Sequence, residues 1–125
     1  MPSRPSTILM VEDEMPILKL MNLILSELGF CLLMASDGSQ ALDLCRNHSA
    51  PINLLVTDIQ MPPHMNGLKL AHAVRDLRPG IHVLYISGYN SIYERILEEV
   101  DGIRTWFLQK PFTSMQLVAA VEKAM

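Results

Sequence analysis

The sequence predicts a doubly wound α/β fold, in which a five-stranded parallel sheet carries helices on both faces. Five short apolar runs alternate with five segments whose apolar residues recur at helical spacing. Strict alternation with short connections requires right-handed crossovers and parallel strands. The common strand order for such a sheet is 2-1-3-4-5, and ligands bind outside the carboxyl ends of its strands, where the order reverses.

The first half of the chain is expected to form three strands and two helices. Pro16 suits a first helical turn and Gly29 a helix end, and the turn at 36–39 supplies capping residues for the second helix. Residues 1–6 are rich in proline and serine, so a flexible tail is expected before one domain at 7–125. The expected strands are 7–11, 30–35 and 54–58, and the expected helices are 16–28 and the segment between the 36–39 turn and about residue 47.

The second half repeats the pattern. Asn66 and Gly67 open a helix that Pro79 and Gly80 close, and Thr113 or Ser114 caps the last helix. The fourth helix has the weakest apolar face of the five. The expected strands are 81–86 and 105–109, and the expected helices are 67–77, 92–100 and the segment after the 113–114 cap.

Polar side chains stand at the carboxyl ends of four of the expected strands. The strand order brings those after the first and third strands, Glu12, Asp13 and Asp58, into one crevice. Ser87 and Lys110, after the fourth and fifth strands, lie on the same edge of the sheet. Two carboxylates about 4 Å apart repel by roughly 4 kcal/mol at an effective dielectric near 20, so three of them require a counter-charge. A hard divalent cation such as Mg²⁺, which prefers oxygen ligands, is the natural partner.

From residue 8 to residue 124 the chain resembles the response-regulator receiver domains of two-component signalling. This resemblance implies a flavodoxin-like fold. Four motifs carry the resemblance, in the order and spacing of the family: Glu12-Asp13, Asp58-Ile59-Gln60-Met61-Pro62, Ser87-Gly88 and Lys110-Pro111-Phe112. The Ser87-Gly88-Tyr89 turn and the short last helix resemble receivers of hybrid sensor kinases. A stand-alone module and a part of a longer protein both fit the sequence.

The resemblance assigns a role to each of these positions. It makes Asp58 the phosphoacceptor, and it makes Asp13, Asp58 and the backbone carbonyl of Gln60 direct ligands of Mg²⁺, with Glu12 acting through water. Lys110 binds one phosphoryl oxygen, aided by a cis Lys110-Pro111 bond, and the Ser87 hydroxyl or a nearby backbone N–H binds another. A carboxylate can attack phosphorus when the charge on the transferred oxygens is neutralised, so the chemistry agrees with the assignment.

The expected function is a phosphoacceptor switch rather than an enzyme. A histidine kinase or a histidine phosphotransfer domain donates the phosphoryl group, Ser87 moves toward it, and Phe107 turns inward, which reshapes a partner surface. The chain is expected to be a monomer or a weak dimer. The kinase, the pathway and the output partner are not encoded in any pattern of this sequence.

Several alternatives stay open. A strand-end Asp is by itself usually a turn or capping residue, and Glu12-Asp13-Glu14 can be a solvated helix start. A receiver-like interaction module that is not phosphorylated is the main functional alternative. An aspartyl phosphatase carries a second Asp where this chain has Gln60, and a flavodoxin carries a phosphate-binding loop after the first strand, where this chain has acids.

Composition excludes other classes of protein. The formal net charge of -3 is spread evenly, which argues against direct nucleic-acid binding. No uncharged apolar stretch approaches the roughly 18 residues of a membrane span, so no membrane insertion and a cytoplasmic setting are expected. Cys31 and Cys45 are expected to be buried free thiols. The spacing from Asp58 to Gly67 is one residue longer than is usual in the family, so the intervening loop is enlarged.

Overall fold

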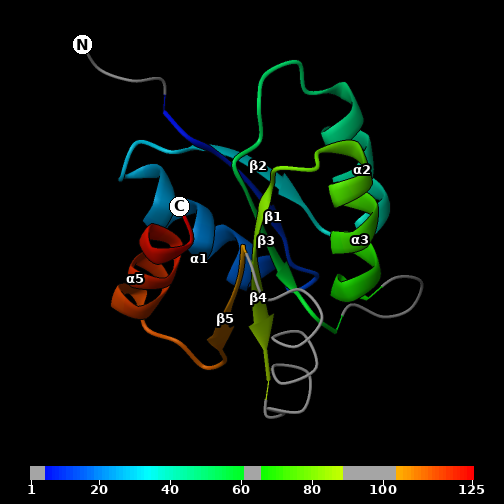
Figure 1. The fold of residues 1–125 in the computed structure, drawn as a ribbon. Helices are drawn as coiled ribbons and strands as arrows, with labels where there is room; N and C mark the ends of the chain where they lie inside the picture. The colour runs from blue at the N-terminus through cyan, green and yellow to red at the C-terminus, as the bar shows by residue number, and fades with distance from the viewer. Residues whose placement is uncertain (1–4, 61–65, 89–103) are drawn as a thin grey trace.

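Figure 1 shows the computed structural model, which describes residues 5–60, 66–88 and 104–125. The five strands are parallel and lie in the predicted order, β2-β1-β3-β4-β5. The strands are β1 (Thr7–Val11), β2 (Cys31–Ala35), β3 (Leu54–Asp58), β4 (His82–Ser87) and β5 (Thr105–Gln109). The helices are α1 (Met15–Ser26), α2 (Gly38–Asn47), α3 (Gly67–Leu77) and α5 (Ser114–Ala124). The predicted helix at 92–100 lies outside the described residues.

The sheet separates two apolar cores. In Figure 1, α2 and α3 cover one face of the sheet and α1 and α5 cover the other. Successive residues of a strand point to opposite faces, so Leu9 and Val11 of β1 pack on the α2/α3 side, while Ile8 and Met10 pack on the α1/α5 side. All five residues of β1 and of β3 are buried, which explains why both strands are continuous apolar or β-branched runs up to the edge.

Side-chain caps fix the helix starts close to the predicted positions. Thr113, rather than Ser114, caps α5, and the side chain of Gln116 completes a capping box by accepting a hydrogen bond from the Thr113 amide. Pro16 lies in the first turn of α1, as predicted. The caps of α2 and α3 are Asp37 and Asn66. Among the described residues, no helix has the length and apolar character that a membrane crossing requires.

Several local predictions are wrong for reasons of tertiary context. β4 begins and ends one residue later than the predicted 81–86, and it reaches Ser87 because Ser87 pairs with Gln109 of β5 instead of starting the next turn. β2 begins at Cys31 rather than at residue 30. Cys31 is exposed because β2 is an edge strand, whereas Cys45 is buried as predicted, and both thiols are free.

The apolar stripe of the first helix is wider than the surface that covers it. Leu18, Met21 and Leu25 are buried, but Leu20 is half-exposed because it lies on the opposite side of α1. Leu28, the last residue of the predicted helix, lies beyond the end of α1 and is also half-exposed.

Gly67 allows the start of α3 to lie directly against the end of β3. A Cβ atom at this position would lie 2.1 Å from the carbonyl oxygen of Asp58, and the Gly67 amide donates to the carbonyl of Ile59 at 2.7 Å. Real Cβ atoms do not approach a backbone oxygen so closely, so any larger residue forces α3 and β3 apart. The glycine therefore sets the distance between the helix and the strand that carries Asp58.

We predict that Gly67→Ala lowers the free energy of unfolding by about 2 kcal/mol or more, because the added methyl overlaps backbone atoms that have little room to move. Urea unfolding measures the change. Gly80→Ala is the matched control, since nothing lies within 4 Å of a Cβ there, and we expect it to change stability by less than about 0.5 kcal/mol. Equal effects of the two substitutions would contradict the close contact.

Candidate functional site

Three predicted carboxylates meet at the carboxyl ends of β1 and β3. The two strands are neighbours, and Val11 of β1 is in register with Thr57 of β3, so the residues that follow lie side by side. Glu12, Asp13 and Asp58 each offer a carboxylate oxygen, and these oxygens lie within 4.8 Å of one another. This cluster, called the acidic pocket below, stands where the strand order reverses.

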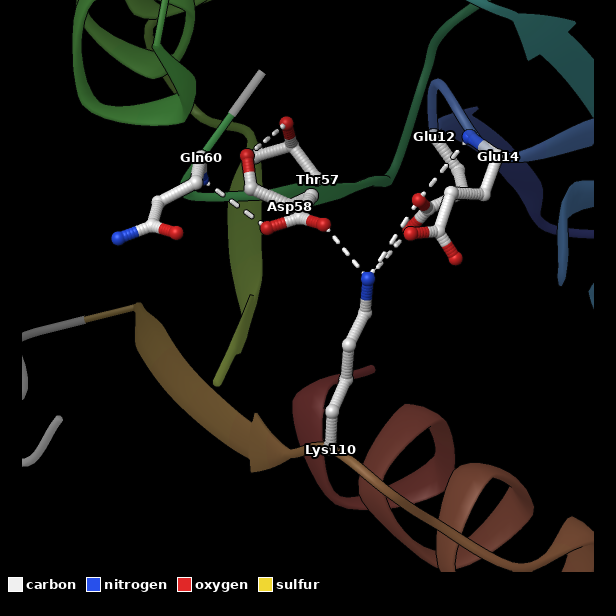
Figure 2. Close-up of polar contacts among 6 residues, drawn as sticks. All are labelled: Glu12, Glu14, Thr57, Asp58, Gln60 and Lys110. Carbon is white, nitrogen blue, oxygen red and sulfur yellow. Dashed lines mark hydrogen bonds and ion pairs between the residues drawn. The ribbon is translucent and has the colours of Figure 1, made fainter. Parts of the chain in front are cut away.

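Lys110 supplies the positive charge of the acidic pocket. Figure 2 shows its side chain reaching from the end of β5 toward the carboxylates. Nζ donates to Oδ2 of Asp58 at 2.7 Å and lies 3.3 Å from Oε2 of Glu12. The Lys110 amide donates to the carbonyl of Ser87 at 2.8 Å, and the Lys110-Pro111 bond is cis, as the family resemblance implies.

Backbone groups hold the carboxylates in place. The amide of Gln60 donates to Oδ1 of Asp58 at 3.0 Å, and the amide of Glu14 donates to Oε1 of Glu12 at 3.3 Å (Figure 2). Within residues 5–60, 66–88 and 104–125, the Gln60 amide and Lys110 give each oxygen of Asp58 one hydrogen-bond donor. The Asp58 side chain is still 10% exposed, so a reactant can reach it, whereas the Glu12 side chain is fully buried.

The pKa of Glu12 lies well above that of a free carboxyl group. Burial is the main cause of the rise, the charge of Lys110 lowers the pKa and the charge of Asp58 raises it, and the net value is about 7. Burial also acts to lower the pKa of Lys110, but the hydrogen bond to Asp58 and the charge of Glu12 outweigh this effect and raise it. Oε2 of Glu12 is a buried atom that accepts no hydrogen bond in the described structure. Three carboxylates, one ammonium and an unsatisfied oxygen fit a divalent cation.

The other predicted residues lie on the adjoining strands. Ser87 ends β4, and its neighbour Ile86 is in register with Asp58, so Ser87 stands at the same edge of the sheet. Phe107 lies on β5 beside Tyr85 of β4, and their rings stack with centroids 5.7 Å apart. The structure thus brings Glu12, Asp13, Asp58 and Lys110 together, and it places Ser87 one strand away.

Sequence reasoning missed three residues that support the site. The hydroxyl of Thr57 donates to the backbone carbonyl of Asp58 at 3.0 Å, Gly67 packs on that same carbonyl, and Tyr85 is the ring partner of Phe107. A threonine inside an otherwise apolar buried strand is a visible signal, because a buried hydroxyl needs a partner. The pairing of Tyr85 with Phe107 depends on the register of β4 and β5, which the local pattern does not specify.

The comparisons with known proteins agree with this geometry. The family model described as the response regulator receiver domain matches residues 8–122. The chain belongs to the receiver-domain family. A solved response regulator receiver protein from Sinorhizobium medicae is similar to it with a TM-score of 0.80 and 30% identity, covering 96% of this chain and 94% of that one.

The curated relatives of this receiver domain are longer proteins. The transcriptional regulatory protein GlrR of Escherichia coli is 26% identical over 125 residues, which are all of this chain and 27% of the relative. The sensor kinase CckA of Brucella abortus is 30% identical over 122 residues, which are 97% of this chain and 13% of the relative. The chain therefore spans about a quarter or less of these two relatives.

We predict that the stability of the metal-free receiver domain falls as the pH rises from about 4.5 to about 7. Folded Glu12 holds a proton in this window that unfolded Glu12 releases, so the contribution is complete below pH 4.5 and lost above pH 7. At 1.36 kcal/mol per pKa unit, its upper limit is about 3 kcal/mol. Urea unfolding across this range in a chelating buffer measures it.

Glu12→Gln is expected to flatten this part of the pH profile, since the amide does not titrate. Glu14→Gln is the matched control, because Glu14 is exposed and, in the part of the chain that the structure describes, its contact with the pocket is made by its backbone amide. The same slope in Glu12→Gln and in the unchanged chain would show that Glu12 is not the titrating group.

Proposed function

We propose that this receiver domain is a phosphoacceptor switch in which Asp58 takes a phosphoryl group from a histidine kinase or a histidine phosphotransfer domain. Receiver domains as a family take phosphoryl groups from such proteins. The observation that carries the proposal is the 2.7 Å contact between Nζ of Lys110 and Oδ2 of Asp58 inside an acidic pocket. A carboxylate fixed beside one ammonium is suited to phosphoryl transfer, in which neutralising charge matters more than a base.

In the proposed reaction a carboxylate oxygen of Asp58 attacks phosphorus. The new O–P bond forms as the N–P bond of the donor phosphohistidine breaks, and its electron pair stays on the imidazole nitrogen. The Gln60 amide and Lys110 hold the Asp58 carboxylate in one orientation before the attack, so little reorganisation is needed. As charge gathers on the transferred oxygens, the Lys110 ammonium stabilises it as a compact point charge.

The pocket also suits a resident Mg²⁺. Asp13, Asp58 and the backbone carbonyl of Gln60 would bind it directly, and Glu12 would act through water. A bound Mg²⁺ neutralises negative charge on the carboxylates and on the transferred oxygens. The carboxylate oxygens of Glu12, Asp13 and Asp58, which lie within 4.8 Å of one another, support this assignment, because one ammonium does not balance three carboxylates.

We predict that acetyl phosphate with Mg²⁺ adds one phosphoryl group to the chain and that Asp58→Asn abolishes the addition. Intact mass spectrometry measures it, and a chelator is expected to prevent it. Asp43→Asn is the matched control, since Asp43 lies on the exposed surface of α2, where its carboxylate pairs only with Arg46 among the described residues. Lys110→Ala is expected to block the response to phosphorylation.

The outcomes separate the candidate functions. A phosphoryl adduct that persists in Asp58→Asn would contradict the assignment of the acceptor. A folded chain that binds Mg²⁺ but never gains the adduct would favour the interaction module that is not phosphorylated. No change in thermal unfolding with millimolar Mg²⁺, either in the unchanged chain or in Asp13→Asn, would contradict the metal assignment.

The proposed readout runs through Ser87 and Phe107. A phosphoryl group adds about -1.5 to -2 charges and strong acceptor oxygens, toward which the Ser87 hydroxyl moves. Phe107 then turns inward, and its stacked contact with Tyr85 changes. In its favour, Phe107 is half-buried against the α2/α3 core, and Ser87 lies two residues from Tyr85 on the same strand.

We predict that beryllofluoride, a stand-in for the phosphoryl group on Asp58, changes amide hydrogen exchange in β5 of the unchanged chain but much less in Ser87→Ala. The variant is expected to keep its acceptor, because a backbone N–H can take the place of the hydroxyl at the phosphoryl oxygen. Exchange measured by mass spectrometry on peptides covering 105–109 reports the change. Identical responses in both proteins would contradict a role for Ser87 in the readout.

A further inference from the structure

A cavity of about 590 Å³ lies at the end of the sheet where the strands begin, away from the acidic pocket. Its walls come from the connection between α2 and β3 and from the connection between α3 and β4 (Figure 1). Polar side chains of Ser49, Asn53 and Arg78 line it, together with the apolar side chains of Pro51, Pro79 and Ile81. Apolar walls with a few polar groups, in a volume of roughly 300 to 1,000 Å³, are typical of small-molecule sites.

Arg78 brings to this cavity a positive charge that no described carboxylate balances. Its guanidinium donates from Nε and Nη2 to the carbonyl of Cys45, from Nη2 to that of His48, and from Nη1 to that of Ala50. These bonds hold the guanidinium in place and leave one N–H of Nη1 for a ligand. Within the described ranges, no acid pairs with Arg78 and no Asp or Glu side chain lines the cavity.

A second guanidinium lies beside the cavity. Nη1 of Arg104 is 3.5 Å from the carbonyl of Pro79, and in the part of the chain that the structure describes Arg104 pairs with no carboxylate. Its φ of 67° is unfavourable for a residue with a side chain, and such strain is often kept at ligand sites. The C-terminal ends of α2 and α3 carry about half a negative charge each, so the guanidiniums of Arg78 and Arg104 exceed them.

Asn53 adds neutral donors to the wall of the cavity. Its Oδ1 accepts a hydrogen bond from the Thr7 amide at 2.8 Å, and this bond orients the side-chain amide. Since an N–H needs an oxygen as its acceptor, Nδ2 is the remaining group, with two N–H donors. Among the described residues nothing accepts from Nδ2, so both donors are available to a ligand.

We propose that this cavity binds a small organic phosphate, a phosphate monoester with an apolar group. Its oxygens accept from Arg78, Asn53 and the Ser49 hydroxyl, which are three kinds of donor from two connections of the fold. The apolar group lies on the proline and isoleucine walls. Because the site is at the opposite end of the strands from Asp58, its occupancy is tested without phosphorylation of Asp58.

Titration with phenyl phosphate in a chelating buffer tests the site, with amide chemical shifts as the readout. Without Mg²⁺ the acidic pocket repels this probe, so binding there does not interfere. Saturable shifts are expected in residues 49–53 and 78–82, with a Kd on the order of 1 mM for a probe of this size. Benzyl alcohol, a neutral probe of similar size, is expected to leave these shifts nearly unchanged. Shifts that do not saturate, shifts confined to other segments, or equal effects of the two probes overturn the proposal.

Asn53→Asp tests the role of charge without removing Arg78, whose bonds to three carbonyls support the fold. The new carboxylate keeps an oxygen for the Thr7 amide and places a negative charge where Nδ2 stood. The affinity for phenyl phosphate is therefore expected to fall about tenfold.

Asn22→Asp is the matched control, because it adds the same charge on α1, on the other face of the sheet, and is expected to change the affinity less than about twofold. Equal affinities of the two variants overturn the proposal. Asp58→Asn is expected to bind phenyl phosphate as the unchanged chain does, so a failure of this site and a failure of the phosphoacceptor are distinguishable.

Discussion

The contact of one ammonium with two buried carboxylates is the constraint on which the site depends. Lys110 lies 98 residues from Glu12 and 52 from Asp58 along the chain, yet its Nζ reaches both. Burying such groups is unfavourable unless they are paired, and removing the cation leaves uncompensated charge. The parallel sheet solves the problem by ending β1 and β3 side by side and by bringing the end of β5 to the same edge. The two apolar cores supply the stability that offsets the repulsion.

A second constraint acts from behind Asp58. Its backbone carbonyl accepts a hydrogen bond from the buried hydroxyl of Thr57, and Gly67 packs against the same group. The Gln60 amide then holds one carboxylate oxygen from the other side. Because the backbone and the carboxylate of Asp58 are both fixed, the pocket is organised before any reactant arrives. Preorganised donors of this kind stabilise developing charge without the cost of reorienting at the moment of reaction.

The fold, and the meeting of Glu12, Asp58 and Lys110 at one edge of the sheet, could be predicted because both follow from regular patterns. Continuous apolar runs in the sequence indicated the strands. The acids or the lysine that follow these runs indicated the edge of the sheet formed by the carboxyl ends of the strands. What failed depends on neighbours that are distant in sequence. Cys31 is exposed because β2 has a partner on one side only, and Ser87 belongs to β4 because it pairs with Gln109. The complete burial of Glu12, which raises its pKa to about 7, is likewise invisible in a run of three acids.

β4 and β5 connect the acidic pocket to the interior of the sheet. Ser87 ends β4 at the pocket, and Lys110 follows β5 there, held to Ser87 by a backbone hydrogen bond of 2.8 Å. Tyr85 lies two residues before Ser87 on β4, and Phe107 lies three residues before Lys110 on β5. The rings of Tyr85 and Phe107 stack on each other. A displacement of either strand end therefore acts on the same ring pair, which packs on the α2/α3 core. β1 and β3 separate the edge strand β2 from this pair, so the pocket and the rings share the other half of the sheet with β4 and β5.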